Sequence, residues 1–183
     1  MTLHARAGEL LLALVLFRLL WGVFGSSSAR FSHFIGVPGR ALQHLGRLFR
    51  REPDREAGHN PAGGWMALLL LVLLLLQVLT GLYIDNDIAN EGPLTEIIPT
   101  AIADLISTLH EVLWYVLLGA VALHLAAVAV YERVKGHRLV AAMIHGRKTL
   151  PDDVAAPRIE SAWRALALAI GAAALALTLT VYL

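Results

Sequence analysis

The sequence predicts an all-α fold, a transmembrane four-helix bundle, from three observations. Apolar residues make up 57% of the chain and charged residues only 16%, a balance too apolar for an ordinary globular domain. The mean hydropathy of +0.65 agrees with this. The apolar residues gather in four stretches, each near the roughly 20 residues that a helix needs to cross a bilayer. We therefore expect residues 1–183 to form a single membrane domain.

The apolar stretches give the predicted spans, which are residues 5–25, 64–84, 109–131 and 162–182. The second is the clearest, because no polar residue interrupts it until Gln77 and Thr80. The first contains Arg6, Glu9 and Arg18, and a small-residue stretch follows it, so a cleaved signal peptide is an alternative. Its apolar run is long for a signal peptide and its internal charges are unusual for one, which favours a span.

Loop charges predict the orientation of the spans. Residues 26–60 hold six Arg against three acids, and residues 132–160 hold six Lys or Arg against four acids. Residues 85–108 hold no Lys or Arg and five acids, which are Asp85, Asp87, Glu91, Glu96 and Asp104. Because positively charged loops stay in the cytoplasm, we expect the two basic loops inside and both termini outside.

The composition also excludes several classes of function. The chain has no Cys, and so cannot hold a disulfide, a thiolate zinc site, an iron–sulfur cluster or a covalently attached c-type haem. A net charge of +1 argues against a nucleic-acid partner, which would need a concentrated basic face. Any metal must be held by His, Met or carboxylate ligands, and the eight His are the most unusual feature.

Two histidines lie on the third predicted span. His110 and His124 are fourteen residues apart, which places them about 21 Å apart on nearly the same face of a helix. Ionisable side chains within a span are costly and usually functional, although hydrogen bonding between helices is the alternative. Neutral imidazole is a common ligand of haem iron, and an apolar haem suits the core of a helix bundle.

A haem with two imidazole ligands needs a second histidine on a facing helix. His4, at the outer start of the first span, is level with His110, and Gly8 one turn later would let a porphyrin approach the backbone. The alternative for His4 is an exposed residue near the terminus. The sequence therefore predicts an outer haem site between His4 and His110, with His124 as a third candidate iron ligand.

His124 has no histidine partner at its own depth in the other spans. Arg18 is at that depth and shares a helix face with His4. A buried guanidinium pairs well with a carboxylate such as a haem propionate, and the alternative is an Arg that extends to the inner headgroups. The remaining imidazoles lie in predicted cytoplasmic segments, and they are His33, His44, His59, His137 and His145.

Five short motifs, in this order, resemble the bacterial cytochrome b561 family, which includes the b-type cytochrome subunits of nickel–iron hydrogenases. They are Phe17–Gly22, Gly25-Ser26 with Ala29-Arg30-Phe31, Gly58-His59-Asn60-Pro61 with Gly63, Leu109-His110-Glu111 with His124, and Met143–Lys148. The resemblance covers about residues 3–148. It implies a b-type cytochrome of the bacterial inner membrane, an electron-transfer protein of a respiratory chain rather than an enzyme.

The resemblance also implies ligands and partners. Family members hold two b haems, one near each membrane surface, between pairs of histidines. Here the outer haem would lie between His4 and His110. On this resemblance, we expect the chain to begin at the family's second helix, which leaves the inner haem at His124 without its usual partner. Three explanations remain for the inner site. Either the start of the chain has been lost or misassigned, or a partner subunit completes the site, or only one haem b is bound. The partners implied are membrane lipid, a quinone, and a redox protein such as a hydrogenase, a dehydrogenase or a c-type cytochrome.

The cytoplasmic motifs add Arg30, His59, Arg147 and Lys148 near the inner surface, where haem propionates or an anionic group at a quinone site could accept their hydrogen bonds. The alternative for the basic residues is the ordinary positive charge of cytoplasmic loops. For His59 we expect a structural or redox-site role rather than iron ligation.

The sequence also allows two other functions. One is a haem-poor structural or assembly subunit of a membrane redox complex. The other is a His-based metal transporter, although the spans contain almost none of the additional ligands that this function needs.

Overall fold

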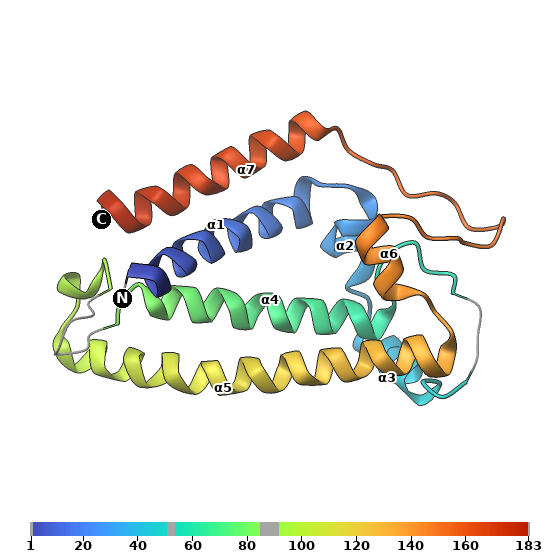
Figure 1. The fold of residues 1–183 in the computed structure, drawn as a ribbon, viewed down its shortest axis with the longest axis horizontal. Helices are drawn as coiled ribbons and strands as arrows, with labels where there is room; N and C mark the ends of the chain where they lie inside the picture. The colour runs from blue at the N-terminus through green and yellow to red at the C-terminus, as the bar shows by residue number, and fades with distance from the viewer. Residues whose placement is uncertain (1, 51–53, 85–91, 183) are drawn as a thin grey trace.

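The computed structural model describes residues 2–50, 54–84 and 92–182, and within these ranges the chain is helical and has no strand. Four helices of this described part are long and apolar enough to cross a membrane. They are α1 (Thr2–Phe24), α4 (Pro61–Gly81), α5 (Thr100–Val130) and α7 (Ala162–Leu177), shown in Figure 1. The candidate span that contains α7 continues past Leu177 to Thr180. The prediction of an all-α helical bundle is therefore confirmed, and each predicted span lies on one of these helices.

The largest difference from the predicted spans is the start of α5, which begins at Thr100 and not near residue 109. The extra turns contain polar residues that resemble a loop in the sequence. In the structure the hydroxyl of Ser107 donates to the Ala103 carbonyl at 2.9 Å, and that of Thr108 donates to the Asp104 carbonyl at 3.0 Å. Because these hydroxyls bond to the preceding turn, they do not interrupt the helix.

The starts of α4 and α7 follow from capping residues. The side chain of Asn60 accepts the backbone N–H of Gly63 at 2.7 Å, and Pro61 occupies the first helical position. Ser161 accepts the N–H of Arg164 at 3.3 Å in the same way. Asn and Ser before a helix, and Pro at its first position, satisfy or replace N–H groups that have no partner within the helix.

The four long helices alternate in direction and lie in the order α7, α1, α4, α5 (Figure 1). Leu12 of α1, Val78 of α4 and Ala176 of α7 are buried in one cluster. A second cluster joins Leu73 of α4 to two leucines of α5. Most of the apolar surface of each span faces outward, as a helix in contact with lipid requires.

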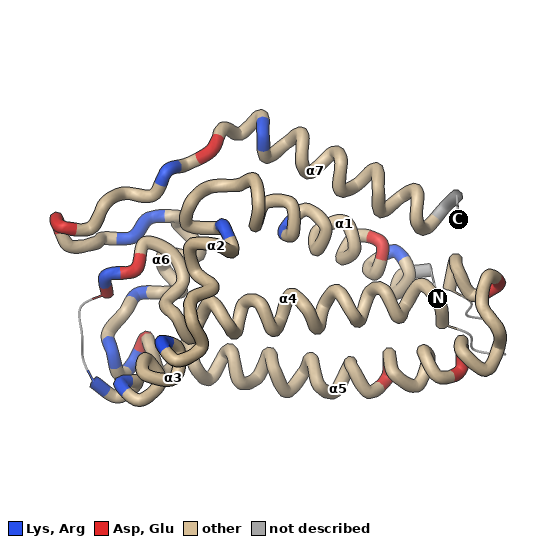
Figure 2. The backbone as a smooth tube through the Cα atoms, turned by 180° about the vertical axis from the view of Figure 1, so that it is seen from behind, with Lys and Arg blue, Asp and Glu red and all other residues tan. Residues whose placement is uncertain are grey.

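The short helices gather at one end of the long ones. They are α2 (Phe31–Phe34), α3 (Pro38–Gly46) and α6 (Leu139–His145). Most Lys and Arg residues lie there (Figure 2), and we call this the basic end, comprising residues 25–50, 54–60 and 131–164. The opposite end, which carries Glu96 and Asp104, is called the acidic end. Asp85, Asp87 and Glu91 of the predicted outer loop lie outside the described residues.

Two glycines allow α2 to pack between α1 and α4. A Cβ at Gly22 of α1 would overlap the ring of Phe31, and a Cβ at Gly64 of α4 would overlap the carbonyl of Phe34. Any larger residue at these positions would push α2 away from the long helices. The aromatic side chains of α2 therefore reach the space beside the basic ends of α1 and α4.

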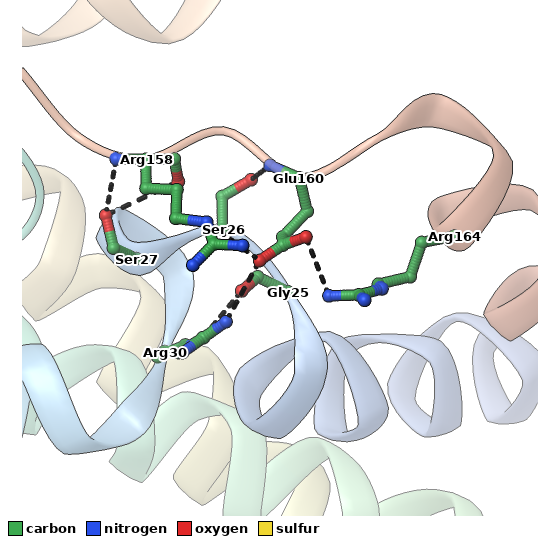
Figure 3. A network of polar contacts seen from close by, with 7 residues as sticks. All are labelled: Gly25, Ser26, Ser27, Arg30, Arg158, Glu160 and Arg164. Atoms are coloured by element: carbon green, nitrogen blue, oxygen red, sulfur yellow. Dashed lines mark hydrogen bonds and ion pairs between the residues drawn. The ribbon is translucent and has the colours of Figure 1, made fainter.

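Glu160 connects the segment before α7 to the turn after α1 (Figure 3). Its carboxylate is only 8% exposed and accepts hydrogen bonds from Arg30 at 3.1 Å and from Arg164 at 2.6 Å. Arg158 adds a third guanidinium at 3.7 Å. A carboxylate this well covered by protein, with charged donors around it, contributes more than an exposed ion pair.

Backbone groups strengthen this connection. The N–H of Glu160 donates to the hydroxyl of Ser26 at 3.0 Å, and the N–H of Arg158 donates to the hydroxyl of Ser27 at 2.9 Å. Ser27 also donates its own N–H to the carbonyl of Arg158 at 3.0 Å. These bonds set the position of α7 along α1 at the basic end.

We predict that Glu160→Gln destabilises the fold, because three guanidinium groups lose the negative charge that they share. The expected loss in the free energy of unfolding is about 2 kcal/mol. Asp153→Asn is the matched control, since its ion pair with Arg55 is exposed and is worth about 0.5 kcal/mol. The measurement is Tm by circular dichroism in detergent, and equal shifts in the two variants would contradict the prediction.

Candidate functional site

His4 of α1 and His110 of α5 meet at the acidic end. Their ring centroids are 6.3 Å apart, with an angle of 82° between the ring planes. His4 is exposed on its helix, and His110 is half-buried. The structure thus brings together the two residues that the sequence predicts as the outer ligand pair.

His110 is held in place by α4. Its Nδ1 lies 3.0 Å from the hydroxyl of Thr80, and its Nε2 lies 3.0 Å from the amide nitrogen of Gln77. Gly81 leaves room for the ring, since a Cβ there would stand 3.3 Å from the imidazole Cε1. Gln77 and Thr80 were not predicted as site residues. The signal that could have found them is their i, i+3 spacing in an otherwise apolar span, which places both on one helix face.

The residues at this end fit a pair of axial ligands for one iron. A metal–imidazole bond is about 2 Å long, so rings with centroids 6.3 Å apart are at a separation that suits one iron between them. Both ring nitrogens of His110 have a protein contact, Nδ1 with Thr80 and Nε2 with Gln77, so ligation through Nε2 would require Gln77 to give up its contact. A Cβ at Gly8 would meet no atom within 4 Å, so there is open space on α1 one turn from His4.

A second group of predicted residues lies at the basic end, around Arg18 of α1. The guanidinium carbon of Arg18 lies 5.1 Å from the centroid of Phe31 and 5.8 Å from that of Phe34. These distances are typical of cation–π contacts. One terminal nitrogen of Arg18 is buried and has no hydrogen-bond acceptor among the residues that the structure describes. A buried donor without an acceptor fits an anionic oxygen of a bound group.

His59 lies beside this arginine. Its ring centroid is 4.7 Å from that of Phe34. The surrounding protein atoms lower the pKa of His59, and the charges of Arg18, His124 and Lys148 lower it further. Part of the His59 side chain remains exposed to solvent. His59 and His124 are therefore close enough for their charges to interact, a proximity that the sequence alone did not predict.

The other predicted site residues make contacts within the protein or face solvent. Arg30 donates from Nε to the Gly25 carbonyl at 2.7 Å, in addition to its ion pair with Glu160. Lys148 pairs with Asp54 at 2.8 Å. Arg147 is exposed. The roles predicted for these three residues toward propionates or a quinone remain predictions.

Comparison with known families finds a match to the amino-terminal four fifths of the chain. A family model described as prokaryotic cytochrome b561 matches residues 1–146, a range that includes α1, α4, α5 and α6. No significant match was found among curated proteins or solved structures. The match covers both histidines of the outer pair and the cluster around Arg18.

We predict that His59 makes the protein less stable at acidic pH. Because its pKa is lowered in the folded protein, the unfolded chain takes up a proton first as the pH falls below about 6.5. The contribution of neutral His59 to the free energy of unfolding is fully present above that pH, and it is lost as the pH falls below it. His59→Gln should therefore lose less in Tm than the wild type between about pH 7.5 and 5.5. His33→Gln on α2 is the exposed control, and identical pH profiles for all three proteins would count against the prediction.

Proposed function

The chain belongs to the prokaryotic cytochrome b561 family, and on this basis we propose that it is a membrane electron carrier that holds haem b between His4 and His110. Members of this family are membrane b-type cytochromes that bind haem b and transfer electrons. The observation that carries the proposal is the 6.3 Å approach of two imidazole rings from separate helices. The four candidate spans agree with a multi-pass membrane protein.

The protein's contribution at this site is ligation and orientation. Haem b supplies one-electron redox chemistry when it is bound. The ring nitrogens of His4 and His110 would hold its iron, and Thr80 orients the imidazole of His110 through Nδ1. A hydrogen bond at that nitrogen raises the basicity of the ligand. The apolar cluster of Leu73, Leu113 and Leu117 excludes water from the adjoining helix interface.

The basic end supports a second, inner site. Arg18 offers a buried guanidinium nitrogen to a carboxylate, and the charges of Arg18 and His124 both act on His59. We propose that Arg18 pairs with a propionate of a haem ligated by His124. Arg30, His59, Arg147 and Lys148 belong to the same end, where they would bind propionates or an anionic group at a quinone site.

The proposed partners follow from this arrangement. Electrons would pass between a quinone or a dehydrogenase and a second redox protein such as a hydrogenase or a c-type cytochrome. The proposed location is a bacterial inner membrane with the basic end in the cytoplasm. The charge distribution of Figure 2 supports this orientation, because positively charged segments stay on the cytoplasmic side.

We predict that His110→Ala removes the outer haem and lowers the haem-to-protein ratio by about one, because an iron held by two imidazoles loses one ligand. The measurement is the pyridine haemochrome assay with a reduced-minus-oxidised spectrum of the detergent-purified chain. His33→Ala is the matched control and should keep the wild-type ratio. Unchanged haem content in His110→Ala would overturn the proposed ligand pair. A folded wild type that takes up no supplied haem would favour a structural or assembly subunit.

We predict that Arg18→Gln makes the midpoint potential of the haem near His124 more negative. A nearby cation stabilises the reduced centre, which carries one positive charge less, and removing the cation reverses this effect. Redox titration followed in the visible spectrum measures the shift. Arg40→Gln, on α3 at the same end, is the control for general surface charge. An equal shift in both variants, or none in either, would argue against a propionate partner for Arg18.

A further inference from the structure

A cavity of about 840 Å³ lies at the basic end, between the end of α5 and the loop after α6. Its described lining is strongly basic. It contains one carboxylate, Asp54, and six basic or imidazole side chains, which are Lys135, His137, Arg138, His145, Arg147 and Lys148. The haem and quinone roles proposed above leave most of these residues without a function.

Two glycines shape this cavity. Gly136, after the last turn of α5, has a φ of 75°, and Gly146, after α6, has a φ of 66°. Residues with a Cβ rarely adopt this left-handed conformation, so glycine is the residue that allows each turn. The two turns reverse the chain on either side of α6 and bring the basic residues that flank it around one space.

Among the described residues, the lining of the cavity holds more positive than negative charge. Asp54 is shared between Lys148 at 2.8 Å and His137 at 3.5 Å. Arg138 and Arg147 form no ion pair with any residue in the described ranges. Two guanidinium groups beside one cavity match the several oxygens of a phosphate group better than a single-point anion.

The outer face of α6 is apolar, which fits a position of the cavity at the level of lipid headgroups. Val140, Met143 and Ile144 are 44%, 66% and 71% exposed. The same short helix turns Ala141, Ala142 and His145 toward the cavity. A helix with exposed apolar side chains on one face and a basic site on the other, next to the end of a membrane span, is typical of the boundary between headgroups and acyl chains.

We propose that this cavity binds the phosphate group of an anionic phospholipid. The phosphate would lie among Arg138, Arg147 and the neighbouring basic side chains, and the acyl chains would follow the apolar face of α6. Basic pockets beside the cytoplasmic ends of membrane helices are suited to such headgroups. Free phosphate shares this chemistry but has no acyl chains for the apolar face to contact.

The test compares two double variants of the full chain in neutral detergent. Arg138→Gln with Arg147→Gln removes two positive charges from the cavity. Arg40→Gln with Arg47→Gln removes two exposed charges from α3 and its C-terminal cap, which do not line it. Native mass spectrometry with added phosphatidylglycerol or phosphatidylcholine measures bound lipid. We expect the wild type to favour phosphatidylglycerol and the cavity variant to bind it about tenfold more weakly. The α3 variant should change binding less than about twofold.

Equal weakening in both double variants would overturn the proposal, and so would a wild type that binds the two lipids equally. Inorganic phosphate forms a separate arm. If phosphate alone displaces phosphatidylglycerol at a similar concentration, the ligand is free phosphate and the lipid proposal is wrong. Circular dichroism checks the fold of each variant. If the double variant does not fold, Arg147→Gln alone, at an exposed position, should still weaken lipid binding about threefold.

Discussion

Hydrocarbon offers no hydrogen-bond partners, so every polar side chain within the four long helices needs a partner from the protein or from a bound group. Most of these partners are visible in the structure. Thr80 and Gln77 contact the ring of His110, and the hydroxyls of Ser107 and Thr108 bond to the preceding turn of α5. Two buried side-chain atoms of these helices have no partner in the described chain, a guanidinium nitrogen of Arg18 and Oε1 of Gln77. The need for hydrogen-bond partners in hydrocarbon therefore divides the polar residues into two groups. Some are satisfied within the protein and support the helices, and others, such as Arg18, have a free group that a bound ligand could satisfy.

The sequence predicts the helices well because their signals are local. Apolar length identifies each span, and Asn60 with Pro61 marks the start of α4. The order of the helices in space is not local. All four spans have similar apolar surfaces, so hydropathy cannot show that α1 lies between α7 and α4. The early start of α5 is hidden for a related reason, because Ser107 and Thr108 look like loop residues until their hydroxyls are seen to bond within the helix.

The candidate site shows the same division. The number of residues from the end of a span gives the depth of a side chain in the membrane. His4 and His110 are at the same depth by this count, which agrees with their proximity in the structure. The ion-pair partner of a surface Arg or Lys cannot be found by counting along the sequence in this way. Arg30 meets Glu160 across 130 positions of chain, and nothing near Arg30 in the sequence indicates that contact. The charge effect of His124 on His59 likewise joins residues 65 positions apart, and no local pattern in the sequence indicates it.

The way in which α7 is attached leaves most of its surface independent of the rest of the molecule. The family match ends at residue 146, before α7 begins, and none of the histidines considered as ligands lies on that helix. The helix joins the matched part through Glu160 and through buried small residues, Ala172 and Ala176. Substitutions on its remaining surface can therefore accumulate without replacing any histidine that is proposed as a haem ligand. The sequence of the outward surface of α7 can therefore change in evolution to fit a new neighbouring protein in the membrane, while the residues of the proposed haem sites stay the same.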